Sequence, residues 1–354
     1  MTIDLIKAVL IFLISVNFFS CTGQVGQESQ SVDSEKTTLG KTVLELDQQI
    51  WSIFQDSKRN HWFGSRQKGL YRFDGKTLTQ FTVEDGLADN RVSAIQEYGN
   101  GQLLIQTVKG ISKFDGNRFT TLSVMESSKN EWKLEKNDLW FSYGEDRVCR
   151  YDGEHLYALD LPKQDIEKAF GIKGDNPSYS PYAVSGIGKD KSGNIWFGTG
   201  IAGAFRFDGQ SFLWIGEKEL STLEDGREPG VRSIVEDQDS NIWLSHTLYK
   251  YAITSESTYE KLPGIDLSKQ AVSIELPYYL SAVVDDENKL WMVSFDQGIW
   301  QYDGETLTQF FLKNGPKNVS LLMISKDRDG VLWIGTHNDG VYRYNGVSFE
   351  KFGM

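Results

Sequence analysis

The segment Val184–Ile215 reads VSGIGKDKSGNIWFGTGIAGAFRFDGQSFLWI. It contains four short runs rich in apolar residues, and residues that favour turns separate each run from the next. The runs are Val184–Gly188, Asn194–Thr199, Ala204–Phe207 and Ser211–Ile215. Asp208-Gly209 joins the last two, and Asp-Gly favours the tight turn of a β-hairpin because that turn needs positive φ angles. The segment therefore predicts a small antiparallel sheet of four strands.

The same unit recurs along the chain. Further copies of its second and third runs are WFGS-RQKGLYRFDG (Trp62–Gly75), LIQT-VKGISKFDG (Leu104–Gly116), WFSY-GEDRVCRYDG (Trp140–Gly153), WLSH-TLYKY (Trp243–Tyr251), WMVS-FDQGIWQYDG (Trp291–Gly304) and WIGT-HNDGVYRYNG (Trp333–Gly346). With the segment quoted first, this makes seven copies, and subtraction of the first residue numbers, with Trp196 as the fourth, gives intervals of 42, 36, 56, 47, 48 and 42 residues. A period near forty with four strands per unit is typical of a β-propeller. We therefore predict an all-β fold, a single seven-bladed β-propeller with four antiparallel strands per blade.

The repeats also predict where each blade begins and ends. The expected blades are Ile50–Phe81, Val92–Leu122, Trp132–Leu161, Val184–Ile215, Val231–Leu262, Leu280–Leu312 and Val319–Phe352. The last one ends in an outermost strand, so the ring is expected to close by packing blade seven against blade one, without a strand borrowed from the other terminus. Thr42–Asp47 alternates apolar and polar residues and could add a strand to a blade edge, but we favour a ring without it.

Composition limits the classes of partner. The chain has 37 Lys and Arg against 49 Asp and Glu, a formal net charge of −12. A protein that follows the phosphates of a nucleic acid needs a basic surface, so we expect no nucleic-acid partner. An aromatic content of 13% suits blades that stack face to face, because aromatic side chains fill the space between sheets.

The N-terminus has the pattern of a targeting segment. Lys7 precedes the apolar run Ala8–Phe19, which is too short to span a bilayer and ends next to Ser20-Cys21. This resembles a bacterial lipoprotein signal, in which the cysteine becomes lipidated, although an ordinary secretory signal is the alternative. We expect a signal peptide over residues 1–20, lipidation of Cys21, a flexible tether over 21–41 and the propeller over 42–354. The protein would then be a monomer of the cell envelope, on the periplasmic side or the cell surface, held to the membrane by its lipid alone.

Differences in repeat length fall in one connection, which runs from the fourth strand of a blade to the first strand of the next. The long inserts are Val83–Arg91, Pro162–Ala183, Glu217–Gly230 and Pro263–Tyr279. In a propeller they emerge on the same face as the loops between second and third strands. Function on repeat scaffolds usually lies where insertions collect, so we call this the insert face and expect the site there.

Two inserts carry tyrosines beside prolines: Tyr179 and Tyr182 in PSYSPY, and Tyr278 and Tyr279 in PYY. Proline stiffens a loop, and tyrosine offers a flat apolar face with a hydroxyl at its tip. This combination suits a sugar ring or a peptide backbone, and Arg227 on a third insert could add a charged contact. The alternative is that each tyrosine only packs its insert against a blade.

The loops that follow the second strands add Asp296, His337 and Asp339 to the predicted ligand-binding residues. His246 and His337 also keep an enzyme open, with Asp296 or Asp339 as the partner that would orient a histidine base. The sequence has no nucleophile elbow and no phosphate-binding loop. We therefore predict no catalytic residues and retain this histidine pair as the alternative.

Two recurrent polar positions are predicted to be structural. Turns that begin at Asp190, Asp237, Asp285 and Asp327 lack the bidentate acid of a calcium loop, and Asp and Asn favour turns in any case; we expect no metal and no cofactor. A basic residue stands before the last aromatic of the third strand in six repeats: Arg72, Lys113, Arg150, Arg206, Lys250 and Arg343. We expect these side chains to pack and to form salt bridges between blades.

The repeats resemble the two-component regulator propeller family, whose unit reads roughly D-G-L-x-x-N-x-V, then D-x-x-G-N-x-W-x-G-T, then G-L-x-R-[FY]-D-G. The matching residues are Asp85, Gly86, Leu87, Asn90 and Val92 for the first part, Asp190, Gly193, Asn194, Trp196, Gly198 and Thr199 for the second, and Gly69–Gly75 for the third. The resemblance covers about 50–352. It implies a periplasmic sensor propeller, of the kind found in hybrid histidine kinases that detect carbohydrate fragments. We expect this chain to be a stand-alone lipoprotein member, since no kinase region and no transmembrane helix follow its repeats.

The expected function is extracytoplasmic binding and sensing. The ligand would be a carbohydrate, a peptide-like molecule or an envelope protein. Streptogramin lyases are also seven-bladed propellers with histidine chemistry near the axis, so a lyase-like enzyme is the alternative. A purely structural adaptor is a further one.

Overall fold

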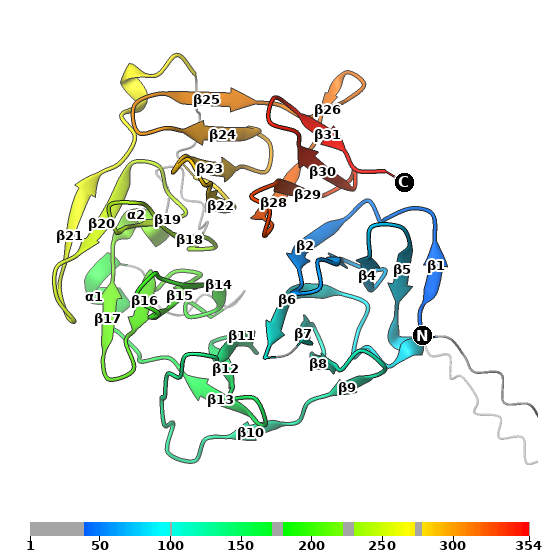
Figure 1. Ribbon diagram of the computed structural model, residues 1–354. Coiled ribbons are helices and arrows are strands. Elements are labelled where there is room, and N and C mark those ends of the chain that lie inside the picture. The colour runs from blue at the N-terminus through cyan, green and yellow to red at the C-terminus, as the bar shows by residue number, and fades with distance from the viewer. Residues whose placement is uncertain (1–38, 100, 172–179, 222–229, 273–277, 354) are drawn as a thin grey trace, which may run out of the picture. The chain divides into compact units, whose positions relative to one another are not determined.

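The computed structural model describes residues 39–353, except 100, 172–179, 222–229 and 273–277. Figure 1 shows the strands of these residues as small sheets arranged in a ring, and the chain passes around it from blade one (blue) to blade seven (red). The seven-bladed propeller with four-stranded blades is thus confirmed. None of the described helices is long and apolar enough to cross a membrane.

Six blades place their four strands antiparallel, in sequence order from the axis outward. Blade one has β2 (Ile50–Gln55), β3 (His61–Ser65), β4 (Leu70–Phe73) and β5 (Leu78–Phe81); blade two has β6 (Val92–Tyr98), β7 (Gln102–Thr107), β8 (Gly110–Phe114) and β9 (Phe119–Thr121); blade four has β14 (Val184–Lys189), β15 (Ile195–Thr199), β16 (Ala204–Phe207) and β17 (Phe212–Ile215). Blade five has β18 (Ile234–Glu236), β19 (Asn241–Leu244), β20 (Tyr249–Ile253) and β21 (Tyr259–Pro263); blade six has β22 (Ser281–Val284), β23 (Leu290–Val293), β24 (Ile299–Tyr302) and β25 (Leu307–Phe310); blade seven has β28 (Leu321–Lys326), β29 (Leu332–Thr336), β30 (Val341–Tyr344) and β31 (Phe349–Lys351).

Blade three reaches four strands in a different way. β11 (Leu139–Tyr143), β12 (Arg147–Tyr151) and β13 (Leu156–Asp160) are the second, third and fourth strands of the repeat, but no first strand precedes them. β10 (Val124–Glu126) instead pairs in parallel with β13 at the outer edge. The expected start of this blade at Trp132 is therefore wrong. The Trp132 ring stacks on Trp140, with centroids 5.6 Å apart, and belongs to no strand.

The ring closes as expected, by packing blade seven against blade one. Trp333 of blade seven lies against Phe63 of blade one, with centroids 6.0 Å apart, and both pack against Phe352. The N-terminal segment does form an edge strand, contrary to our preference: β1 (Lys41–Val43) pairs antiparallel with β5. This strand extends the outer edge of blade one, and its Val43 packs against the apolar cluster shared by blades one and seven.

Apolar side chains fill the spaces between neighbouring blades. The cluster between blades three and four contains Trp140, Phe197, Phe205 and Phe207, all nearly inaccessible to solvent. Complete burial of one large apolar side chain contributes about 1.5–3 kcal/mol, so such interfaces supply most of the stability of a propeller. This explains why the aromatic residues recur at fixed places in each repeat.

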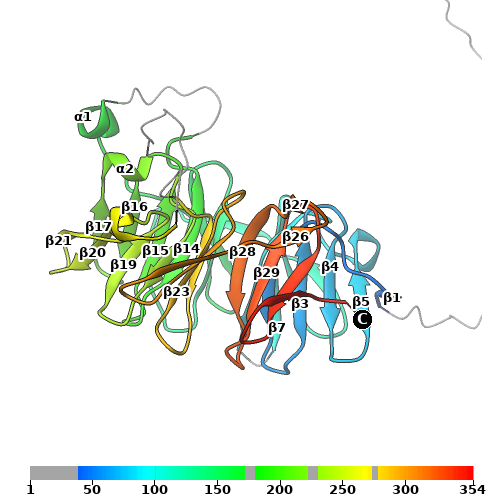
Figure 2. The ribbon, with the colours of Figure 1, turned by 90° about the horizontal axis from the view of Figure 1, so that it is seen from above.

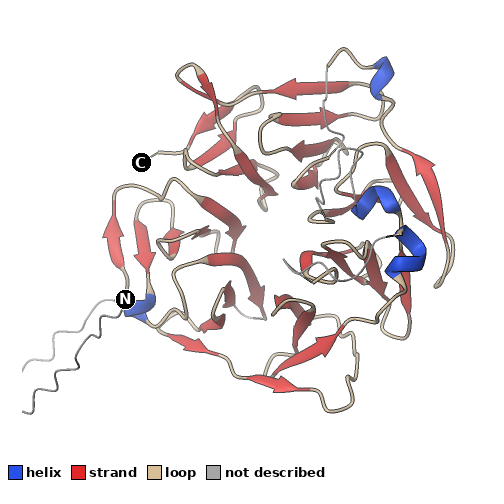
Figure 3. Cartoon of the chain, turned by 180° about the vertical axis from the view of Figure 1, so that it is seen from behind, coloured by secondary structure: helices blue, strands red, loops and turns tan. Residues whose placement is uncertain are grey.

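In the part of the chain that the structure describes, helices occur only in the connections between blades, as the blue segments of Figure 3 show. They are η1 (Val83–Asp85), α1 (Ile166–Phe170), α2 (Lys218–Ser221) and η2 (Leu267–Lys269). Figure 2 shows α1, α2 and the short hairpin of β26 (Lys313–Asn314) and β27 (Lys317–Asn318) on the same side of the ring. The inserts thus collect on one face, as the repeat lengths predict.

Candidate functional site

Backbone hydrogen bonds join the inserts to the loops between second and third strands on the insert face. The N–H group of Gly69 donates to the carbonyl oxygen of Asn90, and that of His337 donates to Ser320. His246 forms an isolated bridge with Tyr278. The described inserts and loops are therefore bonded to each other between blades one and two, five and six, and six and seven.

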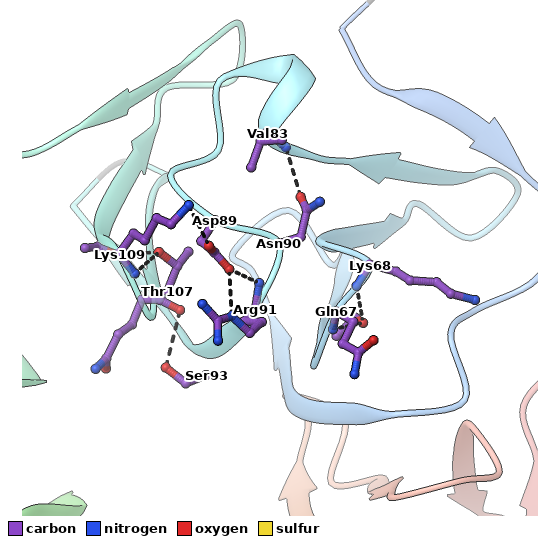
Figure 4. Close-up of polar contacts among 12 residues, drawn as sticks. Gln67, Lys68, Val83, Asp89, Asn90, Arg91, Ser93, Thr107 and Lys109 are labelled. Carbon is purple, nitrogen blue, oxygen red and sulfur yellow. Dashed lines mark hydrogen bonds and ion pairs between the residues drawn. The ribbon is translucent and has the colours of Figure 1, made fainter. Parts of the chain in front are cut away.

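The first part of the repeat motif builds one such crossing, from blade one to blade two (Figure 4). The side chain of Asn90 accepts a hydrogen bond from the N–H of Val83 at 2.9 Å. Asp85 accepts from the N–H of Thr82, and Gly86 ends the short helix with a φ of 98°, which favours glycine. Leu87 is buried between the two blades. These motif residues fold the connection and leave ligand contacts to other side chains.

A buried carboxylate holds two cations at the same crossing (Figure 4). Asp89 accepts from Nε of Arg91 at 3.1 Å and pairs with Nζ of Lys109 at 3.3 Å. Burial alone would raise the pKa of Asp89, but the hydrogen bonds from these cations hold it below its usual value. The carboxyl therefore stays ionised and keeps both cations in place.

Of the predicted tyrosines that the structure describes, Tyr182 and Tyr279 are buried and Tyr278 is partly buried. Tyr182 is 7% exposed, and its hydroxyl donates to the carbonyl oxygen of Gln164 at 2.8 Å. Tyr279 is completely buried, next to blade six. Burial raises the pKa of Tyr278 to about 12. These placements favour the alternative that the tyrosines pack their inserts against the blades; Tyr179 and Arg227 lie outside the described residues.

The predicted histidine pair is divided between unlike surroundings. His246 is 5% exposed, and its Nδ1 accepts from the N–H of Leu248 at 3.1 Å. Burial lowers the pKa of His246 to about 4, so its ring is neutral near pH 7. His337 follows β29 of blade seven, and its ring contacts that of Phe295 in blade six at a centroid distance of 5.5 Å.

The two predicted aspartates also differ. Asp296 is exposed in the loop between β23 and β24. Asp339 is 4% exposed and fully engaged: its carboxylate accepts from the hydroxyl of Tyr342, from Nδ2 of Asn314 at 2.9 Å and from Nζ of Lys351 at 2.5 Å. Its hydrogen bonds therefore stabilise blade seven and the β26–β27 hairpin.

The aspartates of the turns between first and second strands bind their own blade, and Asp327 of blade seven also contacts Nε2 of His61 in blade one at 3.2 Å. In blade four, Oδ2 of Asp190 accepts from Nε1 of Trp196 at 3.0 Å, and its other contacts are with Asn194 and Arg206. We call this carboxylate the turn aspartate. Arg206 and Lys250 of the third strand each pair with the turn aspartate of their own blade, so the salt bridges expected between blades are wrong for these two residues. Among the described residues, no three acids, histidines or cysteines cluster as metal ligands would.

A cavity of about 630 Å³ lies where blade three lacks its first strand. β6 of blade two and β14 of blade four border it, and the inner edge of β11 lies between them. The lining runs from Ser93 and Ser185 near the insert face to Glu97 and Lys189 near the opposite face. It therefore follows the whole length of an innermost strand.

A β-bulge shapes the insert-face end of the innermost strands. The register shifts by one residue in blades one, two, four and seven. The extra residues are Trp51, Ser93, Ser185 and Leu322, and bulges of this kind re-aim side chains near functional sites. Two of them, Ser93 and Ser185, line the cavity, and the guanidinium of Arg66 lies over the Trp51 ring at 5.2 Å.

Sequence reasoning missed this cavity, although one signal was present. The interval from Leu104 to Trp140 is 36 residues, the shortest of the six, and it is six residues shorter than the interval of 42 before it. Six residues is the length of an innermost strand such as β14. The short interval thus marks the strand that blade three lacks.

Solved structures share the fold at low identity. The extracellular domain of BT4673 from B. thetaiotaomicron, assigned as a hybrid two-component system, has a TM-score of 0.58 at 18% identity; the match covers 88% of this chain and 40% of that domain. A streptogramin B lyase gives 0.59 at 14% identity, covering 88% and 96% of the two chains. YCF48 from Cyanidioschyzon merolae gives 0.58 at 14%, covering 85% and 96%. The chain spans less than half the length of the BT4673 domain, and no curated protein matches its sequence.

A family model matches one repeat directly. Residues 314–338 match the two component regulator propeller. This stretch contains β28, the turn aspartate Asp327 and Trp333 of β29, and Nε1 of Trp333 donates to Oδ2 of Asp327 at 2.8 Å. Residues 314–338 are therefore similar to the repeat of the two component regulator propeller.

Proposed function

We propose that this chain is an extracytoplasmic binding and sensing propeller whose ligand enters the cavity beside β11. The observation that supports this most strongly is the cavity itself, which combines hydroxyls, amides and apolar side chains from three blades. Its size of about 630 Å³ falls within the range of ligand pockets, about 300–1,000 Å³. The ligand classes remain those expected from the sequence: a carbohydrate, a peptide-like molecule or a segment of an envelope protein.

Binding is favoured over the lyase-like alternative by the state of the candidate catalytic groups. A general base needs an accessible nitrogen and an orienting partner. His246 is buried with Nδ1 engaged by the backbone, and Asp339 is occupied by three donors. The streptogramin B lyase shares only the fold at 14% identity, so it adds no argument for catalysis here.

The proposed location is the cell envelope, with the propeller attached through a lipid on Cys21. The support is the pattern of the N-terminal sequence, since Cys21 follows an apolar run that ends at Phe19. Incorporation of a labelled fatty acid into the full chain tests it. Labelling should be lost in Cys21→Ser, and labelling that survives this change would contradict lipidation at that residue.

A blocking variant tests the function. Ser93 lines the cavity and is exposed, so Ser93→Trp should fill its entrance without disturbing a blade interface. Val347, 82% exposed at a turn of blade seven, supplies the matched control Val347→Trp. Thermal unfolding is measured with panels of oligosaccharides and peptides, because a ligand that binds only the folded state raises the melting temperature.

The expected result is a ligand that raises the melting temperature of the wild type and of Val347→Trp but not of Ser93→Trp. If a ligand stabilises all three proteins equally, the cavity is not its site. If neither panel contains a ligand and only a whole envelope protein binds, the structural adaptor is the better account.

A further inference from the structure

The inner edge of β11 is open in blade three. In six blades an innermost strand pairs with the second strand, whereas β11 ends its sheet on the axis side in the described part of the chain. The backbone groups of such an edge can pair with another extended chain. The cavity that follows this edge is bordered by β6 and β14, the innermost strands of the two neighbouring blades.

Two carbonyl groups of this edge point into the cavity. Nε2 of Gln96 donates to the carbonyl oxygen of Trp140 at 2.7 Å, and Nε2 of Gln106 donates to that of Ser142 at 2.9 Å. In an antiparallel strand, the N–H and the C=O of one residue point to the same side. The N–H groups of Trp140 and Ser142 therefore also face the place of the missing strand. At that place the side-chain amides of Gln96 and Gln106, both from blade two, donate to the carbonyl oxygens with which an innermost strand would otherwise pair.

One buried donor of blade three also lacks its usual acceptor. In five blades the tryptophan Nε1 donates to the turn aspartate: Trp62 to Asp56, Trp196 to Asp190, Trp243 to Asp237, Trp291 to Asp285 and Trp333 to Asp327, at 2.7–3.0 Å. Blade two has Leu104 in place of tryptophan and Tyr98 in place of the aspartate. Trp140 is 3% exposed, and its Nε1 has no hydrogen-bond partner within the described residues. A buried unpaired donor costs free energy, so this group favours a ligand that brings an acceptor.

The complete blades show what the missing strand contains. An isoleucine lies opposite the residue that follows the tryptophan or leucine in five of them: Ile53 opposite Phe63, Ile95 opposite Ile105, Ile187 opposite Phe197, Ile234 opposite Leu244 and Ile324 opposite Ile334. In four of these the turn aspartate comes three residues after the isoleucine. Phe141 occupies the corresponding position in blade three, in the cluster it shares with Leu104.

We propose that blade three binds an extended peptide with the pattern Ile-x-x-Asp, which pairs antiparallel with β11 and completes the blade. This deepens the proposed binding function and rests on it. The peptide isoleucine would lie opposite Phe141, and its aspartate would accept from Nε1 of Trp140. Lys136 and Lys189 line the same end of the cavity and are exposed. The carboxylates of Glu97 and Asp138 also line the cavity, but each is paired with an arginine, Arg328 and Arg150, so the two lysines remain to complement an acidic residue. The peptide N–H groups would replace the amides of Gln96 and Gln106.

The probe is a fluorescein-labelled peptide with the sequence VSGIGKD, copied from Val184–Asp190 of this chain. Fluorescence anisotropy measures its affinity for the propeller. Three matched peptides carry Ile→Ser, Asp→Ala or the same residues in scrambled order. Trp140→Phe removes Nε1 and keeps an aromatic ring, and Trp196→Phe is the control in a blade whose acceptor is already present.

We expect the probe to bind the wild type and Trp196→Phe alike, and to bind Trp140→Phe about tenfold more weakly, the loss of one hydrogen bond to a charged group. The Asp→Ala peptide should bind the wild type about tenfold more weakly and should lose nothing further with Trp140→Phe, because the two changes remove the same bond. The Ile→Ser and scrambled peptides should bind more weakly than the probe.

Equal affinity for the probe and the scrambled peptide, or equal loss on Trp196→Phe and Trp140→Phe, would overturn the proposal. If an oligosaccharide binds the cavity, as judged by Ser93→Trp, and no peptide does, strand completion is wrong while the binding function stands. If neither class of ligand binds, both proposals fail.

Discussion

Blades three and four are neighbours in the ring, but different polar contacts hold the start of the second strand in each. In blade four, Asp190 accepts from Trp196 and Asn194 and receives Arg206 only at 3.4 Å. Blade three has no turn aspartate. Asp138 stands there instead, after the position of the missing strand, and pairs with Arg150 through two bonds of 2.6 and 3.2 Å.

The comparison shows that this repeat tolerates the loss of its innermost strand when one ion pair replaces the turn aspartate. The side chains of Arg150 and Asp138 are 8% and 2% exposed. Blade three keeps its outer three strands and its interface with blade four, where Trp132 packs against Trp140 and Phe212. What it loses is the acceptor for Trp140 and the cover over the inner edge of β11. The cavity beside β11 is thus the direct consequence of the missing innermost strand.

The largest expected difference in stability comes from replacing the third-strand arginine in blade three and in blade four. Arg150→Met leaves the carboxylate of Asp138 buried without its ionic partner, and breaking a buried pair in this way costs about 3–5 kcal/mol. Arg206→Met should cost about 1 kcal/mol, because Asp190 keeps its bonds from Trp196 and Asn194 and loses only the contact of 3.4 Å with Arg206. Urea unfolding of the two variants measures the difference. Equal losses would show that the ion pair of blade three has no special role.

The next effect tests the space beside the second strand. An added Cβ at Gly198 would lie 2.1 Å from the carbonyl oxygen of Val231, so Gly198→Ala should destabilise the protein by about 1–3 kcal/mol through overpacking. Ser142 holds the corresponding place in blade three, where it lines the cavity. Ser142→Ala should cost about 0.5–1 kcal/mol, because it removes the hydroxyl that accepts from Nε2 of Gln106 at 2.6 Å. If Ser142→Ala lost more stability than Gly198→Ala in urea unfolding, the space beside β11 would not be open.

The smallest difference isolates one hydrogen bond. Trp196→Phe and Trp140→Phe remove similar apolar area, but only the first breaks a bond to an aspartate. We expect Trp196→Phe to be more destabilising by about 1–2 kcal/mol. The difference between the two melting temperatures, measured without ligand, checks this. If Trp140→Phe is the more destabilising change, its Nε1 has a partner in solution and the comparison between the blades fails.

Most of the fold could be predicted because its signals are local. Each second strand carries its own Trp or Leu, and each Asp-Gly turn sets a hairpin within a few residues. Blade three could not be predicted in the same way. Trp132 and Leu134 alternate with charged residues as in a half-buried strand, yet both pack against the interface with blade four. Only the interval of 36 residues records the missing strand, and its meaning depends on comparison with the other repeats.

The site was less predictable because it depends on burial, which sequence does not show. Tyr182 and Tyr279 have the composition of ligand contacts, but the inserts that carry them fold back onto the blades. Gln96 and Ser185 lie in innermost strands, and Gln106 lies in the second strand of blade two. None of them gave a signal in isolation, since single polar residues are ordinary in strands near an axis. They become a site only because the strand between their blades is absent.

Amide hydrogen exchange of the propeller without ligand tests the central claim most directly. The N–H groups of Trp196 and Gly198 face β14, which covers them, whereas those of Trp140 and Ser142 face the cavity. An unpaired edge exchanges with little opening cost, and a paired core strand opens with a free energy near that of global unfolding. We predict that Trp140 and Ser142 exchange faster than Trp196 and Gly198 by on the order of a hundredfold or more. Equal protection of the four amides would mean that the inner edge of β11 is covered in solution and that blade three has no open slot.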